Sequence, residues 1–184
     1  MTITDVFRYL LSLLVNRNSM KLSETNYSNV QTVCCALLNP EEFDGKEFVW
    51  NDRLFVKDHV RSLLHMPLNF GKVMIRLHEK VEAAEAYSKD GIMLSDEKSL
   101  WGSDVYLEVD REVSECEMAT ISGTFLAKVY EGPYSNMHQW IKDMEEYVRS
   151  QNKDLKKMYF YYSACPKCAK TFGKNYVVIF AQVA

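Results

Sequence analysis

The sequence has no excess of positive charge, although 26% of its residues are charged. It contains 22 Lys and Arg against 25 Asp and Glu, which gives a net charge of −3. Proteins that bind nucleic acid gain much of their affinity from basic side chains that neutralise phosphates. We therefore expect no nucleic-acid partner.

A long apolar run is also missing. The stretch RYLLSLLV at residues 8–15 is far shorter than the roughly 20 residues that cross a bilayer as a helix. It is not followed by the small-residue cleavage site that ends a signal peptide. We expect no membrane partner and a cytoplasmic location. We interpret residues 1–28 as an irregular leader, with Met20 as a candidate start of translation.

The five cysteines lack the spacing of a small disulfide scaffold, so a reducing environment is expected. Cys165 and Cys168 form a CxxC pair with three interpretations. A structural zinc site needs four ligands, and the sequence has neither a second CxxC nor a spaced histidine pair. A redox dithiol normally opens a helix, for which the interval before Asn175 leaves little room. We favour a strand connection whose cysteines pack into the core, and we expect no metal and no cofactor.

The chain does contain enough apolar residues for a core, since 47% of its 184 residues are hydrophobic. This composition predicts one domain over residues 29–184. In its first half, residues 47–65 mix aromatic and β-branched residues with charges, which indicates extended structure. Residues 72–87 then carry apolar side chains at helical spacing, and strands are expected at residues 91–94 and 104–113.

The second half shows the same order of elements. Residues 119–132 predict a strand that ends at a Gly-Pro turn. Ser135 is the expected N-cap of the helix that follows, and that helix is expected to end near Gln151. Two strands are expected at residues 157–163 and 175–183.

Each half, about 47–113 and 119–184, therefore has the pattern of a βαββ unit. One such unit buries one face of its strands under its helix and leaves the other face bare. We predict an α+β fold in which two pseudo-repeated βαββ units form an antiparallel sheet. The helices are expected on one face of this sheet and a ligand cleft on the other.

Three motifs resemble one family. The segment VYEGPYSNMHQWIKDM, with SGTF before it and YFYYSACPKCAKTFGKNYVVIFAQV after it, is similar to the GyrI-like small-molecule-binding proteins. It resembles in particular a stand-alone subgroup labelled hydrolase, over the chain from about Phe48 to the C-terminus. The resemblance implies a tandem βαββ fold of the SOUL and GyrI type, an aromatic cage, and an acidic residue that meets cationic or polarised ligands.

Members of this family differ in what they do with their ligands. Some are the effector domains of drug-sensing regulators, and some stand-alone members open the cyclopropane ring of DNA-alkylating natural products by hydrolysis. The region before Phe48 is too short and irregular for a helix-turn-helix. A transcriptional regulator is therefore not expected.

Two carboxylates are candidates for a general base that activates water, Glu131 and Glu108. Glu131 lies beside the Gly132-Pro133 turn. Glu108 shares a strand face with Tyr106, opposite three apolar residues that are expected to face the helices. Both are therefore expected near the cleft.

Aromatic side chains are expected to hold the ligand. Because side chains alternate along a strand and buried tyrosine hydroxyls need partners, we assign Phe160 to the core and Tyr159 and Tyr161 to the cleft. Trp140 lies on the apolar stripe of its helix and is also assigned to the core. The predicted ligand-binding residues are Trp50, Trp101, Tyr106, Tyr130, Tyr134, Tyr159 and Tyr161.

We expect the protein, as a monomer or homodimer, to bind a hydrophobic, planar or cationic small molecule in this aromatic cleft. The enzymatic form of the hypothesis is hydrolysis of a xenobiotic through opening of a cyclopropane ring by activated water. The non-enzymatic form is a module that sequesters or senses the same ligand. A further alternative is a thiol-redox protein that works through Cys165 and Cys168.

Overall fold

The computed structural model describes residues 35–63, 66–89 and 91–184, so the leader expected at residues 1–28 lies outside the described residues. The described chain is mostly strands interrupted by helices, and the two helices of 14 residues, α2 and α3, are amphipathic. The strands are β1 (Glu47–Leu63), β2 (Met66–Pro67), β3 (Met93–Ser99), β4 (Gly102–Glu108), β5 (Glu117–Glu131), β6 (Leu155–Tyr162) and β7 (Tyr176–Val183). The helices are α2 (Phe70–Ala83), α3 (Met137–Ser150) and α4 (Pro166–Phe172), with 3-10 turns at Pro40–Glu42 and Tyr134–Asn136.

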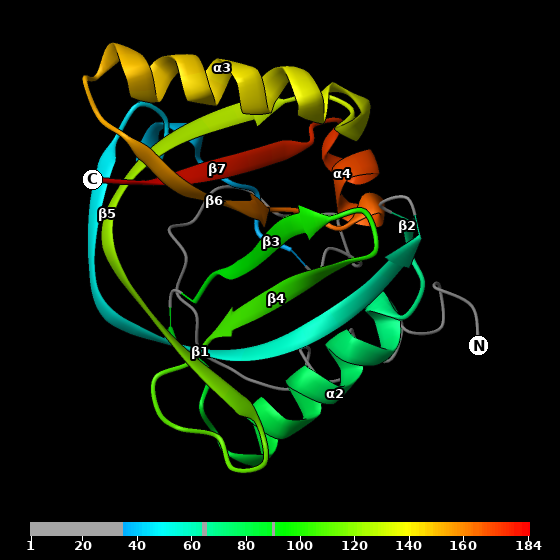
Figure 1. Ribbon diagram of the computed structural model, residues 1–184. Coiled ribbons are helices and arrows are strands. Elements are labelled where there is room, and N and C mark those ends of the chain that lie inside the picture. Colours follow the sequence, from blue (N-terminus) through cyan, green and yellow to red (C-terminus); the bar gives the residue numbers. More distant parts are fainter. Residues whose placement is uncertain (1–34, 64–65, 90) are drawn as a thin grey trace, which may run out of the picture.

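Within the described residues, the strands form one antiparallel sheet in the order β2-β1-β4-β3-β6-β7-β5. β1 also pairs with β5, so the six strands other than the two-residue β2 close into a barrel (Figure 1). The α+β class is confirmed. The sheet closes into a barrel, whereas the sequence predicted a sheet with the helices on one face and a ligand cleft on the other.

β1 closes the barrel because it is long enough to pair on both of its edges. Residues 47–57 pair with β5, and residues 55–61 pair with β4. A β-bulge between Trp50 and Arg53 bends the strand, and Asp52 within it has a φ of 50°. The Asp52 N–H donates to Ser122 Oγ at 2.8 Å. This closure depends on a partner strand far away in sequence, which is why local patterns did not predict it.

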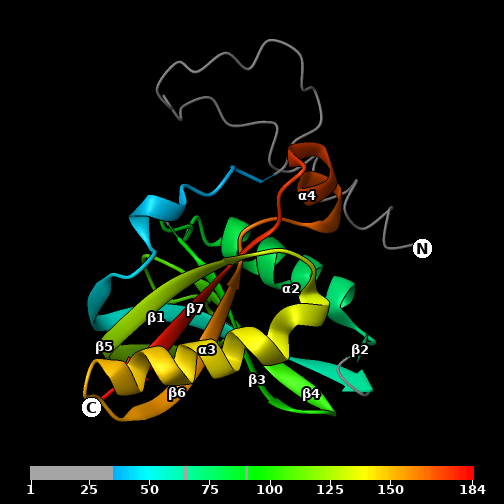
Figure 2. The same cartoon turned by 90° about the horizontal axis from the view of Figure 1, so that it is seen from above.

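The barrel wall separates three apolar clusters. One fills the interior, one lies between the wall and α2, and one lies between the wall and α3. Strand alternation produces this division: on β4, Tyr106 belongs to the interior cluster, whereas Val105 and Leu107 belong to the cluster under α2. Both helices thus cover the outer face of the sheet, on opposite sides of the barrel (Figure 1 and Figure 2).

The apolar stripe of α3 explains how this helix packs. Trp140, Met144 and Val148 recur every four residues and contact the outer face of β5, β6 and β7. Trp140 is buried, as predicted. The helix begins at Met137 after the Tyr134–Asn136 turn, so the prediction of Ser135 as its N-cap is wrong.

The connection between β6 and β7 contains a short helix, α4. The sequence had suggested that the interval before Asn175 leaves little room for a helix. α4 has seven residues, with Pro166 in its first turn, where a missing N–H has no cost. It ends at Gly173, whose φ of 65° is left-handed and suits glycine. Cys165 is the N-cap, which places the CxxC pair at the start of this short helix.

Candidate functional site

Aromatic rings fill the interior of the barrel. Tyr106 and Tyr159 meet edge to face with ring centroids 5.8 Å apart, and Phe125 lies 6.2 Å from Tyr159. Trp50 lies 4.1 Å from Phe125 and 5.1 Å from Phe180. Ring pairs in such geometries stabilise by about 0.5–1.5 kcal/mol beyond the burial of their area. The interior is one connected aromatic surface that includes the predicted ligand-binding residues Trp50, Tyr106 and Tyr159.

Tyr161 lies at the border of this interior. It is half-buried, and its ring centroid is 6.2 Å from that of Phe43, which precedes β1. Phe160, between Tyr159 and Tyr161, belongs to the cluster under α3. The predicted orientations of these three residues are therefore confirmed. Leu38 and Phe43 of the segment before β1 also pack against the interior cluster.

Trp50 presents a polar atom that has no partner. Its side chain is 4% exposed, and its Nε1–H is buried with no hydrogen-bond acceptor among the described residues. The bulge after Trp50 places Arg53 on the same side of the strand, and the guanidinium carbon lies 4.7 Å from the Trp50 ring centroid. The buried indole N–H of Trp50 therefore lies in the aromatic interior, next to the positively charged side chain of Arg53.

Glu108 is buried and forms an ion pair with Arg53. Arg53 Nε and Nη2 donate to the two carboxylate oxygens at 2.7 and 2.5 Å, and the Ile92 N–H donates to Oε2 at 3.1 Å. The Glu108 side chain is 9% exposed and that of Arg53 is 28% exposed. Bidentate pairs of this kind are strong and fix the orientation of both groups. The predicted location of Glu108 on the inner face with Tyr106 is thus confirmed, and Arg53 is the partner that the sequence reading missed.

A second buried ion pair links β3 to β6. Lys157 Nζ lies 2.7 Å from Asp96 Oδ2, and Asp96 is 4% exposed. The ammonium also lies 4.2 Å from the ring centroid of Tyr159 and 5.6 Å from that of Tyr106. Burial opposes the charge on Lys157, but the hydrogen bonds that its ammonium donates to Asp96 and Tyr159 outweigh burial and raise the pKa of Lys157. The interior thus already holds one cation against tyrosine faces.

Side chains, more than backbone hydrogen bonds, join β3 to β6. In the described chain, the ladder between β3 and β6 consists of one residue pair, Ser95 and Phe160. The ladder between β1 and β5, in contrast, extends over residues 47–57 of β1. Besides the Asp96–Lys157 pair, the Tyr162 hydroxyl donates to Glu97. We call this junction the β3–β6 seam. It is the least regular junction of the barrel.

Glu131 and Tyr134 lie together, but outside the barrel interior. They line a surface cavity of about 550 Å³. The Tyr134 hydroxyl donates to Asn175 Oδ1 at 3.1 Å, and its ring meets Tyr162 edge to face at 5.4 Å. The full set of lining residues is Glu131, Gly132, Pro133, Tyr134, Ala169, Gly173, Lys174 and Asn175. The Gly-Pro turn does bring Glu131 and Tyr134 to a concave surface, beside α4.

Two predicted ligand-binding residues lie elsewhere. Tyr130 points to the outer face, where it stacks on Trp140 at 5.6 Å and its hydroxyl donates to Asp143 Oδ2 at 2.8 Å. It shares strand parity with Leu126, which also faces α3. Trp101 lies in the turn between β3 and β4 and is 63% exposed. The position of Tyr130 under α3 corrects the expectation that it lines the cleft, whereas the cap at Trp101 stays a prediction.

The sequence reading missed Arg53, Lys157 and Asp96. In an uninterrupted strand, successive side chains alternate between the two faces, so Arg53 would lie on the face opposite to Trp50. The bulge places both residues on the same face. The signal that could have corrected this is Asn51-Asp52 inside a strand, since these residue types tolerate positive φ and mark bulges. Lys157 shares parity with Tyr159 and Tyr161, so its location follows from the same alternation that oriented the tyrosines.

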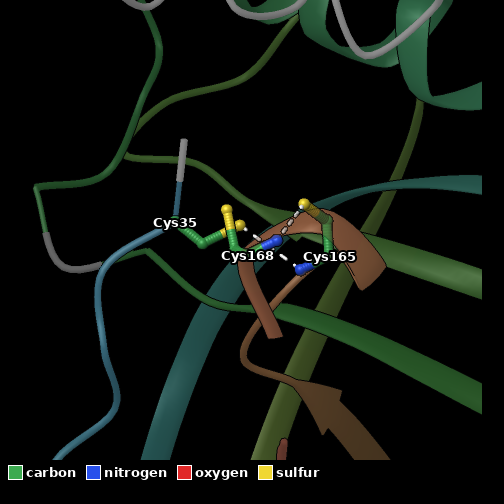
Figure 3. A group of neighbouring side chains, drawn as sticks. All are labelled: Cys35, Cys165 and Cys168. Atoms are coloured by element: carbon green, nitrogen blue, oxygen red, sulfur yellow. Dashed lines mark hydrogen bonds between the residues drawn. The ribbon is translucent and has the colours of Figure 1, made fainter. Parts of the chain in front are cut away.

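The CxxC pair is joined by a third cysteine. Cys35, from the segment before β1, lies beside Cys165 and Cys168, and the three sulfurs are within 4.8 Å of one another (Figure 3). The Cys165 N–H donates to Cys35 Sγ at 3.4 Å, and the Cys168 N–H donates to Cys165 Sγ at 3.5 Å. Burial raises the pKa of Cys35 to about 12. The cluster was not predicted, because Cys35 and Cys165 are 130 residues apart.

The fold and the site together define an α+β barrel with an aromatic, ion-paired interior. The model of the family described as Bacterial hydrolase matches residues 25–183. The chain belongs to this family, which confirms the resemblance to the hydrolase-labelled GyrI-like group. A search of curated proteins finds no match. In the described part of the chain, no helix is long and apolar enough to cross a membrane.

Solved structures support the fold. A hydrolase from Listeria innocua is similar with a TM-score of 0.58 at 11% identity, over 77% of this chain and 93% of that one. An uncharacterized conserved protein from Listeria innocua is similar with a TM-score of 0.59 at 10% identity, over 77% and 94%. At these identities the similarity supports the fold alone.

Proposed function

We propose that the protein binds a hydrophobic, planar organic molecule, neutral or cationic, in the aromatic interior of the barrel. The observation that carries this proposal is the buried Trp50 indole N–H without an acceptor. Such a donor costs about 1–3 kcal/mol when it stays unsatisfied, and each instance in a protein requires an explanation. An acceptor atom on a bound ligand would satisfy it.

The surrounding side chains define the chemical class of this ligand. Tyr106, Phe125 and Tyr159 offer ring faces and edges to a flat molecule. A ligand cation over such rings gains roughly 0.5–2 kcal/mol per ring, depending on how far it is desolvated. It would compete with Arg53 at Glu108 and with Lys157 at the tyrosines. Because these charges are already paired, a neutral planar ligand fits the interior as well as a cation does.

The β3–β6 seam is the proposed route to the interior. Few backbone hydrogen bonds cross it, and the Asp96–Lys157 pair that crosses it lies next to Tyr159. Side-chain contacts can exchange partners without breaking a strand ladder. A ligand can therefore enter while the β1–β5 junction stays intact.

The family description supports hydrolysis as the reaction. As the substrate we propose a xenobiotic that carries a cyclopropane conjugated to a carbonyl, which is what the family resemblance implies. In the proposed step, Glu108 takes a proton from water while the water oxygen bonds to a cyclopropane carbon. The ring C–C bond breaks, its electron pair moves to the conjugated carbonyl oxygen, and the proton returns from Glu108 to that oxygen. One Glu108 oxygen must exchange Arg53 for water. A well-placed general base contributes about 10²–10⁴-fold.

The test is incubation of the purified chain with a cyclopropane-bearing alkylating compound, followed by mass spectrometry. Turnover is expected to give a product that is heavier by one water molecule. Saturable binding without product would leave the non-catalytic alternative, a module that sequesters or senses the ligand. If a panel of planar and cationic aromatic compounds gave no binding and no product, the proposal would be overturned.

Three substitutions locate the site. Glu108→Gln is expected to lower turnover by about a hundredfold or more and to retain binding, whereas Glu131→Gln at the surface cavity serves as the matched control. Trp50→Phe removes the indole donor together with one ring of the side chain, and it is expected to weaken binding by roughly tenfold. If Glu131→Gln abolished turnover and Glu108→Gln did not, the base would belong to the surface cavity.

We further propose that the two halves are structural repeats. The element orders β1-α2-β3-β4 and β5-α3-β6-β7 support this, because each is a βαββ unit. The order of the strands around the closed ring also supports this relation. In the ring, β3 neighbours β6, the next strands on the two sides are β4 and β7, and the ring closes where β1 meets β5. Each of these pairs consists of corresponding strands of the two halves. This is the order that a twofold relation between the halves requires.

A further inference from the structure

The cluster of Cys35, Cys165 and Cys168 is separate from the barrel interior and has the donor set of a metal site. Three sulfur atoms from two distant segments lie within 4.8 Å of one another. Thiolate sulfur is the preferred ligand of zinc and other thiophilic cations, and a CxxC spacing supplies two ligands from one turn of chain. A zinc ion bound tetrahedrally at about 2.3 Å from each sulfur requires sulfurs about 3.8 Å apart. The cluster is therefore close to the size of a zinc site.

The backbone around the cluster is arranged to support negative charge on sulfur. The Cys165 N–H points at Cys35 Sγ, and the Cys168 N–H points at Cys165 Sγ (Figure 3). Hydrogen bonds to ligand atoms orient them and tune the metal in known sites. The backbone at the start of α4 thus donates to two of the three sulfurs and holds them in place.

The cluster is partly shielded from solvent. Cys168 is 1% exposed, and the other two cysteines are half-buried. Adjacent buried thiolates repel each other unless a metal ion compensates them, and a coordinated thiol is deprotonated outright.

We propose that Cys35, Cys165 and Cys168 together bind one thiophilic divalent cation, zinc, as a three-thiolate site. The fourth tetrahedral position is left to a ligand outside these three residues. Counting ligands in the sequence found only the CxxC pair. The fold supplies the third ligand.

The site joins the segment before β1 to the β6–β7 connection. Residues 35–46 run from the neighbourhood of α4 to the start of β1 (blue in Figure 2). Along this segment, Leu38 and Phe43 pack against the interior aromatic cluster, and the Gly45 N–H donates to the Ala127 carbonyl at 2.9 Å. Zinc would anchor the end of a segment that covers part of the barrel interior. The metal site itself does not depend on the proposed ligand function.

The first experiment measures metal binding in the full-length chain. The protein is purified under reducing conditions, treated with zinc and freed of excess, and its metal content is measured by mass spectrometry. About one zinc per chain is expected. Replacement by Co²⁺ is expected to give the near-ultraviolet absorption of thiolate-to-cobalt charge transfer. Cys35→Ser, Cys165→Ser and Cys168→Ser are each expected to weaken zinc binding by about tenfold or more, since even outer partners of a ligand are worth about 10–100-fold.

Cys116→Ser is the matched control, because Cys116 packs under α2, away from the cluster. Cys34 is adjacent to Cys35 but outside the described residues, and it is kept in every variant. If a serine variant fails to fold, alkylation of the wild-type chain decides instead: zinc is expected to slow alkylation of Cys35, Cys165 and Cys168 and to leave Cys116 unchanged. No zinc binding by the reduced wild-type chain, or equal loss in Cys116→Ser, would falsify the proposal. A Cys165–Cys168 disulfide that persists under reduction and excludes zinc would also overturn it.

Discussion

At the scale of single residues, the interior combines aromatic rings with charges that already have partners. Glu108 is paired with Arg53, and Asp96 with Lys157, inside or next to the ring network. Buried pairs seldom add much stability over apolar residues, but removal of one member leaves an unpaired charge and is strongly destabilising. In the proposed function, these pairs set the charges that a ligand meets in the interior.

Arg53→Leu is predicted to destabilise the protein by about 2–3 kcal/mol, because it leaves the buried Glu108 carboxylate without its cation. This value is at the low end for the loss of one member of a buried ion pair, because the Arg53 side chain is still 28% exposed in the folded protein. Equilibrium urea unfolding measures it. Lys153→Met, at the more exposed Lys153–Glu47 pair, is the control and is expected to cost less than about 1 kcal/mol. Equal effects of the two substitutions would contradict the special role of the Glu108 site.

Residue orientations could be predicted from the sequence wherever a strand is regular. Alternation placed Tyr106, Glu108, Tyr159 and Tyr161 correctly, because a period of two holds along β4 and β6. It could not place Arg53, because the bulge in β1 changes the parity after Trp50. The surface cavity at Glu131, the β1–β5 closure and the approach of Cys35 to α4 were also out of reach, since each depends on contacts between distant segments.

At the scale of elements, α2 and the segment after it share a titratable contact. His78 on α2 lies with Nδ1 at 2.7 Å from the Tyr87 hydroxyl, and their rings are 5.8 Å apart. Burial lowers the pKa of His78, and burial followed by the charge of Glu82 raises the pKa of Tyr87 to about 12. Both groups are therefore neutral in the folded protein at neutral pH.

The stability of the fold is predicted to fall as the pH drops through about 6.5. The folded state resists protonation of His78, whereas the unfolded chain takes up the proton at the ordinary histidine pKa of about 6.5. Between the pKa of His78 in the folded protein and about 6.5, the unfolded state thus binds more protons than the folded state. The loss of stability levels off once the pH is below the lowered pKa of His78 in the folded protein. Urea midpoints between pH 8 and pH 5 measure the slope. His78→Gln is expected to flatten it, and the same substitution at His138, exposed on α3, is expected to leave it unchanged.

At the scale of the whole molecule, the barrel has a strong and a weak junction. β1 and β5 share a long antiparallel ladder, and β7 is paired on both edges by β5 and β6. The β3–β6 seam has one residue pair and relies on the Asp96–Lys157 and Tyr162–Glu97 contacts. Local opening of a protein begins where few buried backbone hydrogen bonds must break. The seam is therefore where the closed interior can open.

Amide hydrogen exchange is predicted to follow this difference. Amides of β7 should exchange only through global unfolding, and amides of β3 should exchange through a local opening of lower free energy. Lys157→Met removes a seam contact and is expected to speed exchange in β3 more than in β5. Uniform protection of β3 and β7 in the wild-type chain would show that the seam does not open separately.

The bulge in β1 has a consequence for how this chain tolerates changes of length. β1 has one residue more than β5 at this point, so the inner and outer faces of the strand are exchanged relative to simple alternation. Deletion of Asp52 alone would remove the bulge and keep Trp50 and Arg53 on the inner face, whereas deletion of Asn51 and Asp52 together would turn Phe48 and Trp50 outward. The double deletion would also turn Val49, now 64% exposed, toward the interior. We therefore expect natural length variation at the start of β1 to be limited to the single bulge residue and to occur otherwise in the surface turns.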